Sequence, residues 1–304
     1  MATGLWTAVS GASANIQQVD TVSNNLANQD TLGFKKDTPT FKEYLTTTER
    51  EHEAQDVPRG PIKDKEFYPL DGRDQSFVIV DGTYTNFKQG NLKITKAPLD
   101  LALDGSGFFE VSTPSGVRYT RNGSLKMAMD GRLVTSEGYP VLAVQPGGLA
   151  TALPATASQP SQGGQQTQGG VTVGQGRTPA QIEAEVAGRF INLRDRGTNI
   201  SISEAGEIFA GDQLVAKLNV VEFSDLNKLR KQGGTLFVNA DQTNIKAEPG
   251  RTLVKQGMIE GSNVNPVEEM VNLIKANRSF EHGMKAIKTY SEVLGKEAND
   301  IGKL

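Results

Sequence analysis

Few residues in this sequence have the type and spacing that catalysis or metal binding requires. His52 stands in a polar segment and His282 in a charged helical segment, and neither has a partner at a spacing such as HExxH. Asp100 and Asp104 could form a carboxylate pair of the kind that hydrolyses glycosides. Because Asp104 is followed by glycine, a turn explains the same residues, and we favour the turn. No metal or catalytic site is predicted from these residues.

Cofactor and nucleic-acid sites have equally little support. The GSG at 105–107 lacks the third glycine and the strand-to-helix context of a dinucleotide loop. Arg118, Arg121 and Lys126 lie near Tyr119, but alternation in a β-hairpin gives the same arrangement as a basic aromatic patch. A net charge of -3, with 32 basic against 35 acidic residues, gives no general attraction to nucleic acid. We therefore expect no cofactor, no small-molecule substrate and no nucleic-acid partner.

Features that bear on cell location are few. Cysteine is absent, which leaves the redox compartment open. The N-terminal residues MATGLWTAVSGASANIQQ show no basic region followed by an apolar core and a cleavage site, so no Sec-type signal peptide is expected. No run approaches the roughly 18 apolar residues that span a bilayer. If the protein leaves the cytoplasm, we expect a route without cleavage.

The elements that could position functional residues are clearest at the two ends of the chain. Apolar residues recur there at alternating steps of four and three, which is the stripe of a heptad repeat. We predict one helix over residues 5–26 and a longer one that starts at an Asn265 N-cap followed by Pro266. The helices should extend about 35 Å and 55 Å. The apolar residues of the two stripes are Leu5, Val9, Ala12, Ile16, Val19 and Leu26, and Met270, Leu273, Phe280, Met284, Ile287 and Leu294.

The N-terminal helix is polar but almost uncharged. Asp20 is the single charge in residues 2–29, while Asn24, Asn25 and Asn28 lie on the face away from the stripe. Uncharged amides suit a helix surrounded by other protein, because burying charge is costly and amides can find partners. Glycines within both helical segments weaken them further as isolated helices. We interpret the ends as mobile in the monomer and folded on assembly, with the stripes and these asparagines as subunit interfaces.

The middle of the chain has the sequence pattern of a β domain. Short apolar runs alternate with turn residues, and residues 146–180 have the composition of a flexible low-complexity insertion. The fold class is thus a mostly β central domain of short antiparallel strands with long terminal helices that form a coiled-coil-like assembly domain. Four dipeptides favour tight hairpin turns: Asp81-Gly82, Asp104-Gly105, Asn122-Gly123 and Asp130-Gly131. The predicted regions are an N-terminal assembly helix at 1–35, an extended connecting segment at 36–70, the β domain at 71–260 and a C-terminal assembly helix at 261–304.

Three blocks resemble the signatures of the bacterial flagellar rod and hook family of axial proteins. They are VSNNLANQDTLGFKK, then QGNLKITKAPLDLALDGSGFFEV with YTRNGSLKMAMDGRLVTSEGYPVL, and finally EGSNVNPVEEMVNLIKANRSFEHGMKAI. The blocks occur in the family's order and cover both ends and much of the middle. The last block resembles the proximal rod branch most, with the distal rod branch next. Residues 146–180 stand as an insertion relative to the family, and residues 46–66 follow none of its patterns.

The resemblance implies a structural, non-enzymatic subunit of the basal-body rod. Such a subunit leaves the cytoplasm through the flagellar type III export apparatus without a cleaved signal peptide. It then assembles helically with its own copies and neighbouring rod proteins into the hollow drive shaft between motor and hook. Phe41 and Leu45 match a motif similar to an export-gate recognition sequence, and ordinary core packing on one helical turn is the alternative. From the residues alone, a secreted binding module or adhesin and a carbohydrate-active enzyme remain as rivals.

Overall fold

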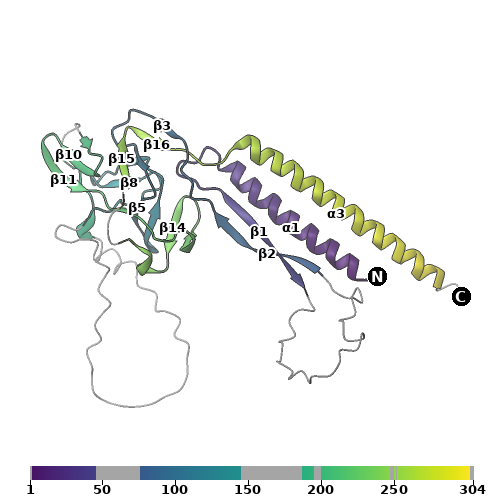
Figure 1. Cartoon of the computed structure of the whole chain (residues 1–304). Coiled ribbons are helices and arrows are strands. Elements are labelled where there is room, and N and C mark those ends of the chain that lie inside the picture. The colour runs from purple at the N-terminus through teal and green to yellow at the C-terminus, as the bar shows by residue number, and fades with distance from the viewer. Residues whose placement is uncertain are drawn as a thin grey trace, which may run out of the picture. The chain divides into compact units, whose positions relative to one another are not determined.

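The computed structural model describes residues 2–45, 76–144, 187–194, 200–246, 250 and 252–301 (Figure 1). The chain forms two compact units, which we call unit 1 and unit 2. Unit 1 contains Met1–Ala27, Asp37–Asn86 and Asn265–Leu304, and unit 2 contains Asn28–Lys36 and Phe87–Val264. The predictions made for residues 46–66 and 146–180 concern segments outside the described residues. Neither of the two long helices that the structure describes has the length and apolar content needed to cross a bilayer.

Unit 1 combines two long helices with one β-hairpin. Helix α1 (Ala2–Ala27) and helix α3 (Pro266–Ile301) lie side by side in opposite directions, and strands β1 (Asp37–Leu45) and β2 (Ser76–Thr85) pair antiparallel next to α1 (Figure 1). The predicted N-cap of the C-terminal helix is confirmed, because Asn265 Oδ1 accepts a hydrogen bond of 3.2 Å from the Val267 N–H. Both terminal helices of the predicted fold class are therefore present, packed within one chain.

Small residues lie at the closest point of the helix–helix contact. Ala12 is buried on α1, and a Cβ placed on Gly283 of α3 would lie 3.6 Å from the Ala12 Cβ. Ala276 is also buried on α3. Small side chains let two helix backbones approach closely, so several large apolar residues of the heptads stay on the outer faces. Only part of each predicted stripe is buried, because Ala12 is buried while Val9 and Ile16 of the same stripe are exposed.

Unit 2 is built from short antiparallel strands. Its largest sheet has five strands in the order β12-β5-β6-β14-β13, and the three-stranded sheet has the order β11-β10-β9. Three further pairs are β15-β4, β16-β3 and β7-β8. The strands are β3 (Leu92–Ile94), β4 (Leu101–Asp104), β5 (Phe108–Thr113), β6 (Gly116–Thr120), β7 (Leu125–Met127), β8 (Leu133–Thr135), β9 (Ile200–Ile202), β10 (Glu207–Ala210), β11 (Gln213–Lys217), β12 (Val220–Val221), β13 (Leu229–Lys231), β14 (Leu236–Asn239), β15 (Leu253–Gln256) and β16 (Met258–Glu260). The mostly β character predicted for the middle of the chain is confirmed.

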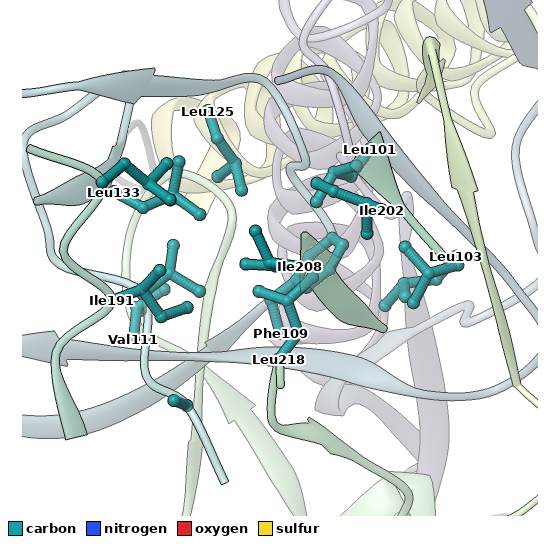
Figure 2. Packing of buried hydrophobic residues seen from close by; sticks show 14 residues of the cluster. Leu101, Leu103, Phe109, Val111, Leu125, Leu133, Ile191, Ile202, Ile208 and Leu218 are labelled. Atoms are coloured by element: carbon teal, nitrogen blue, oxygen red, sulfur yellow. The ribbon is translucent and has the colours of Figure 1, made fainter. Parts of the chain in front are cut away.

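The core of unit 2 lies between these short sheets. Leucine, isoleucine and valine side chains from β4, β5, β8 and β10 point toward one another around Phe109 (Figure 2). A second cluster is aromatic: Phe108 stacks edge-on against Phe223 and Phe237, with ring centroids 5.6 and 5.7 Å apart. Burial of these residues drives folding of unit 2, since the chain has no cysteine to form a disulfide and the described part of this unit contains no long helix.

The region boundaries differ from those expected. Residues 37–45, expected in an extended connection, form β1, and its partner β2 pairs within unit 1 instead of joining the central β domain. The reason is that β1 and β2 pack against α1, which the sequence pattern does not reveal. The export-gate motif also begins and ends on β1, so the alternative of one helical turn for Phe41 and Leu45 is wrong.

Of the four predicted turn dipeptides, only one closes a hairpin. Asp130-Gly131 joins the paired strands β7 and β8, and Gly131 has φ +83°. Asp81-Gly82 instead falls inside β2 at a β-bulge, where the register shifts opposite Thr40 and Phe41. The remaining two dipeptides connect strands of different sheets. The same type of dipeptide thus also occurs in a bulge and between sheets, and only Gly105 and Gly131 of the four glycines have a positive φ.

Candidate functional site

The segment that follows α1, Asn28–Lys36, belongs to unit 2 and is held there through a glycine. Gly33 has φ +69°, and its N–H donates a 2.8 Å hydrogen bond to the Glu260 carbonyl. A Cβ at this position would lie 2.5 Å from the Asn122 nitrogen and 2.6 Å from the Arg121 carbonyl carbon. Glycine is therefore required both for its backbone conformation and for the close approach of another chain segment.

Beside Gly33 lies a buried ion cluster of three residues, Lys35, Arg121 and Glu260. The two oxygens of the Glu260 carboxylate bridge the two cations: Oε1 is 2.5 Å from Lys35 Nζ, and Oε2 is 3.3 Å from an Arg121 guanidinium nitrogen. The side chains of Lys35 and Glu260 have 0% exposure, and that of Arg121 has 2%. The cluster holds two positive charges and one negative charge away from water.

Hydrogen bonds to the backbone add to the cluster. Lys35 donates to the Lys88 carbonyl at 2.8 Å, Glu260 accepts from the Gly90 N–H at 2.9 Å, and Arg121 donates to the Gly105 carbonyl at 2.7 Å. Burial lowers the pKa of Lys35 and of Arg121, and in both cases the Glu260 carboxylate opposes that shift. Glu260 is the only negative charge of the cluster, so its loss would leave two uncompensated cations in the interior, whereas loss of Lys35 would leave a neutral Arg121–Glu260 pair.

Neighbouring contacts join the segment to β13 and to the chain that follows β16. The Lys231 ammonium lies 3.7 Å from the centre of the Phe34 ring and donates a 2.9 Å hydrogen bond to the Lys35 carbonyl. The Asn263 side chain accepts from the Lys36 N–H at 2.7 Å and donates to the Lys88 carbonyl at 3.0 Å. Unit 2 therefore holds chain segments from both ends of the sequence together.

In unit 1, Asn25 has a different role from the one expected. It is 2% exposed, and its side chain makes a paired hydrogen bond with the backbone of Asp37, accepting from N–H at 3.0 Å and donating to the carbonyl at 2.8 Å. It also donates to the Glu269 carboxylate at 3.4 Å. An amide can pair with a strand backbone in this way, and a charged side chain cannot. Asn25 therefore joins α1, β1 and α3 within the chain, and we remove it from the proposed subunit interface.

The other asparagines of the signature differ in burial. Asn24 is exposed, and Asn28 is half-buried and accepts a hydrogen bond from the Thr31 hydroxyl at 3.1 Å. This bond stabilises the turn that follows α1.

The apolar stripe residues fall into two groups. Ala12 is buried, and Val19, Leu26, Leu273, Phe280 and Ile287 are half-buried. Val9, Ile16, Met270 and Met284 are exposed, with Met284 at 47%. The side chains of Leu5, Leu45 and Leu294 lie outside the described part of the structure. Other large apolar residues on the same helices are exposed as well: Trp6, Val267, Val271, Ile274, Tyr290 and Val293.

The residues considered for chemistry do not come together. His282 is exposed on α3, and His52 is outside the described residues. Asp104 is exposed at the end of β4 and precedes Gly105 with φ +131°, which fits the turn interpretation. Arg121 and Tyr119 are buried, so the suggested basic aromatic patch is not a surface feature. Phe41 is exposed on β1.

Sequence reasoning missed the ion cluster, although each signature block contains one of its charges. Lys35 ends the GFK of the first block, Arg121 stands in the YTRNG of the second, and Glu260 begins the EGSNVN of the third. A charged residue within each short motif was the available signal. Its partners could not be assigned, because they lie far apart in the sequence.

Comparison with known proteins gives the same three blocks. Family models described as flagella basal body rod protein, flagellar hook protein FlgE/F/G D1 domain, and flagellar basal body rod FlgEFG protein C-terminal match residues 5–35, 102–210 and 255–301. The flagellar basal-body rod protein FlgG of Borreliella burgdorferi is 30% identical over 313 residues, covering 97% of each chain. FlgG of Buchnera aphidicola from Acyrthosiphon pisum is 29% identical, covering 97% of this chain and 98% of its own. FlgF of Caulobacter vibrioides is also 29% identical, covering 95% and 93%.

The two helices at the chain ends pack as a pair, and the signature motifs build a buried ion cluster. The chain belongs to the flagellar basal-body rod and hook protein family. It is a structural subunit of the rod and not an enzyme.

Proposed function

We propose that this subunit assembles helically with its own copies and with neighbouring rod proteins into a hollow shaft that transmits torque from motor to hook. The observation that carries the proposal is the set of large apolar residues left exposed on α1 and α3 after the two helices have packed together. Val267 is 67% exposed and Ile274 53%, and together with Met270 and Val271 they cover two turns of α3. Contacts that repeat along a helix generate a filament, as a shaft requires.

The subunit interface in this proposal consists of the exposed stripe residues of both helices, with Asn24 and Asn28 as polar contacts. The half-buried residues Leu273, Phe280 and Ile287 contribute at its edge. An interface assembled from many modest contacts distributes load over its area, which suits a shaft under torque. The coiled-coil-like arrangement then extends from one chain to the next.

The route to the basal body is part of the same proposal. The subunit leaves the cytoplasm through the flagellar type III export apparatus without a cleaved signal peptide, and Phe41 with Leu45 serves as an export-gate contact. The exposure of Phe41 supports a recognition role for this pair. We assign the subunit to the proximal rod because its block EGSNVNPVEEM resembles that branch most. The distal rod is the alternative, because relatives named FlgF and FlgG share nearly equal identity with the chain.

Deletion of the gene tests the proposal in the cell. Cells without the subunit are expected to be non-motile and to stop assembly before the hook, because each axial segment is the base for the next. Electron microscopy of isolated basal bodies gives the readout, and complementation with the full-length gene is the control. Motile cells with intact hooks, in a strain that has no second copy of the gene, would contradict the proposed role.

A further inference from the structure

The charges of the buried cluster enter the fold in a fixed order along the chain. Lys35 and Arg121 are both positive and precede Glu260 in the sequence by 225 and 139 residues. Chains are synthesised from the N-terminus, so the two cations are available before the carboxylate. Glu260 arrives with β16, the last strand of unit 2.

Without Glu260, the docked position of Lys35 is unfavourable. Two cations would share a site from which water is excluded, and repulsion between like charges is strong where the effective dielectric is low. Arg121 also feels the Glu222 carboxylate, but that group hydrogen-bonds Thr252 and pairs with Lys246. Glu260 is the acid that contacts both cations directly.

Glu260 also supplies the backbone contact for the same segment. Its carbonyl accepts the Gly33 N–H, and its side chain accepts the Gly90 N–H. Glu260 therefore provides the negative charge, a backbone acceptor for Gly33 and a side-chain acceptor for Gly90. A neutral residue of the same shape could keep both hydrogen bonds and lose only the negative charge.

We propose that Glu260 closes a charge lock: the segment Asn28–Lys36 docks on unit 2 only when β16 has placed Glu260 between Lys35 and Arg121. Docking of the segment that follows α1 thus waits for the C-terminal part of unit 2. The chain that leaves α1 is then held to unit 2 only after nearly all strands of that unit have formed. This inference concerns the single subunit and does not depend on the proposed export route or on assembly.

The test compares three single variants and one double variant of the full-length monomer by hydrogen exchange. In Glu260→Gln the shape is retained and two buried cations remain, so exchange of the Gly33 amide should rise by about 100-fold or more. In Lys35→Met a neutral Arg121–Glu260 pair remains, and the rise should stay below about 10-fold. The Val141 amide, which donates to the Leu133 carbonyl in the core, reports whether the rest of unit 2 stays folded. Glu204→Gln, which removes the exposed partner of Lys255, is the matched control and should leave both amides unchanged.

The double variant Lys35→Met with Glu260→Gln tests the repulsion between the two cations even if Glu260→Gln unfolds the whole of unit 2. Removing Lys35 relieves the repulsion, so the double variant should exchange at least about 10-fold more slowly at the reporting amide than Glu260→Gln alone. If the Gly33 amide exchanged as fast in Lys35→Met as in Glu260→Gln, or faster, the charge lock would be overturned. So would wild-type exchange in Glu260→Gln, or a double variant no better than Glu260→Gln.

Discussion

Met284→Glu is expected to block incorporation of the subunit into the rod while leaving unit 2 folded. Met284 lies on the outer face of α3, where it is 47% exposed in the single chain. If a neighbouring subunit covers this face, the substitution loses about 1–2 kcal/mol of apolar burial. It also adds a carboxylate whose desolvation costs roughly 2 kcal/mol or more. Repetition of the contact along the shaft applies that cost to every subunit added.

Quantification of the subunit in purified basal bodies measures the effect, and we expect a decrease of about 100-fold. Val9→Glu on α1 should behave in the same way. Ser279→Glu is the matched control, because Ser279 is exposed on α3 near Lys275 and His282, on a polar part of the helix surface. Incorporation of Met284→Glu at the wild-type level would show that this face meets no neighbour.

Gly33→Ala is expected to lower the free energy of unfolding of unit 2 more than the same replacement at a glycine that also has a positive φ but has open space around it. The positive φ costs an alanine about 1–2 kcal/mol. The added methyl group would also overlap the backbone at Arg121 and Asn122, which must move by several tenths of an ångström or more. Displacement of Arg121 disturbs the ion cluster, so we expect a further loss of about 1–3 kcal/mol.

Gly138→Ala separates the two effects, because Gly138 has φ +90° and no atom within 4 Å of an added Cβ. Denaturant midpoints of the two variants and the wild type give the comparison. Gly138→Ala should show the conformational cost alone. Equal losses in both variants would mean that the space around Gly33 does not limit the fold.

The terminal helices and the β character of the middle could be predicted, because both rest on local patterns. Heptad spacing specifies a helix, and frequent turn residues between short apolar runs specify many strands. The same spacing predicts only part of the face that each helix buries, since Ala12 is buried while Val9 and Ile16 on the same stripe are exposed. Close packing of Ala12 against Gly283 depends on how two distant segments approach, and large apolar residues are then left outside.

The signature residues show the same division. An uncharged helix surface was recognised at Asn25, but its partner is the backbone of Asp37, which becomes available only when β1 pairs with β2 beside α1. Lys35, Arg121 and Glu260 are ordinary charged residues in the sequence. Their meeting in one buried cluster depends on the topology of unit 2, and no spacing rule spans such separations.

A map of the isolated rod at side-chain resolution tests the central claim most directly, namely that the outer faces of α1 and α3 join the subunits. We predict that Val9, Ile16, Met270 and Met284 are covered by neighbouring subunits in that map. The subunit's position between motor and hook would also separate the proximal from the distal rod. The same side chains facing water, in the lumen or on the outer surface of the shaft, would contradict the claim.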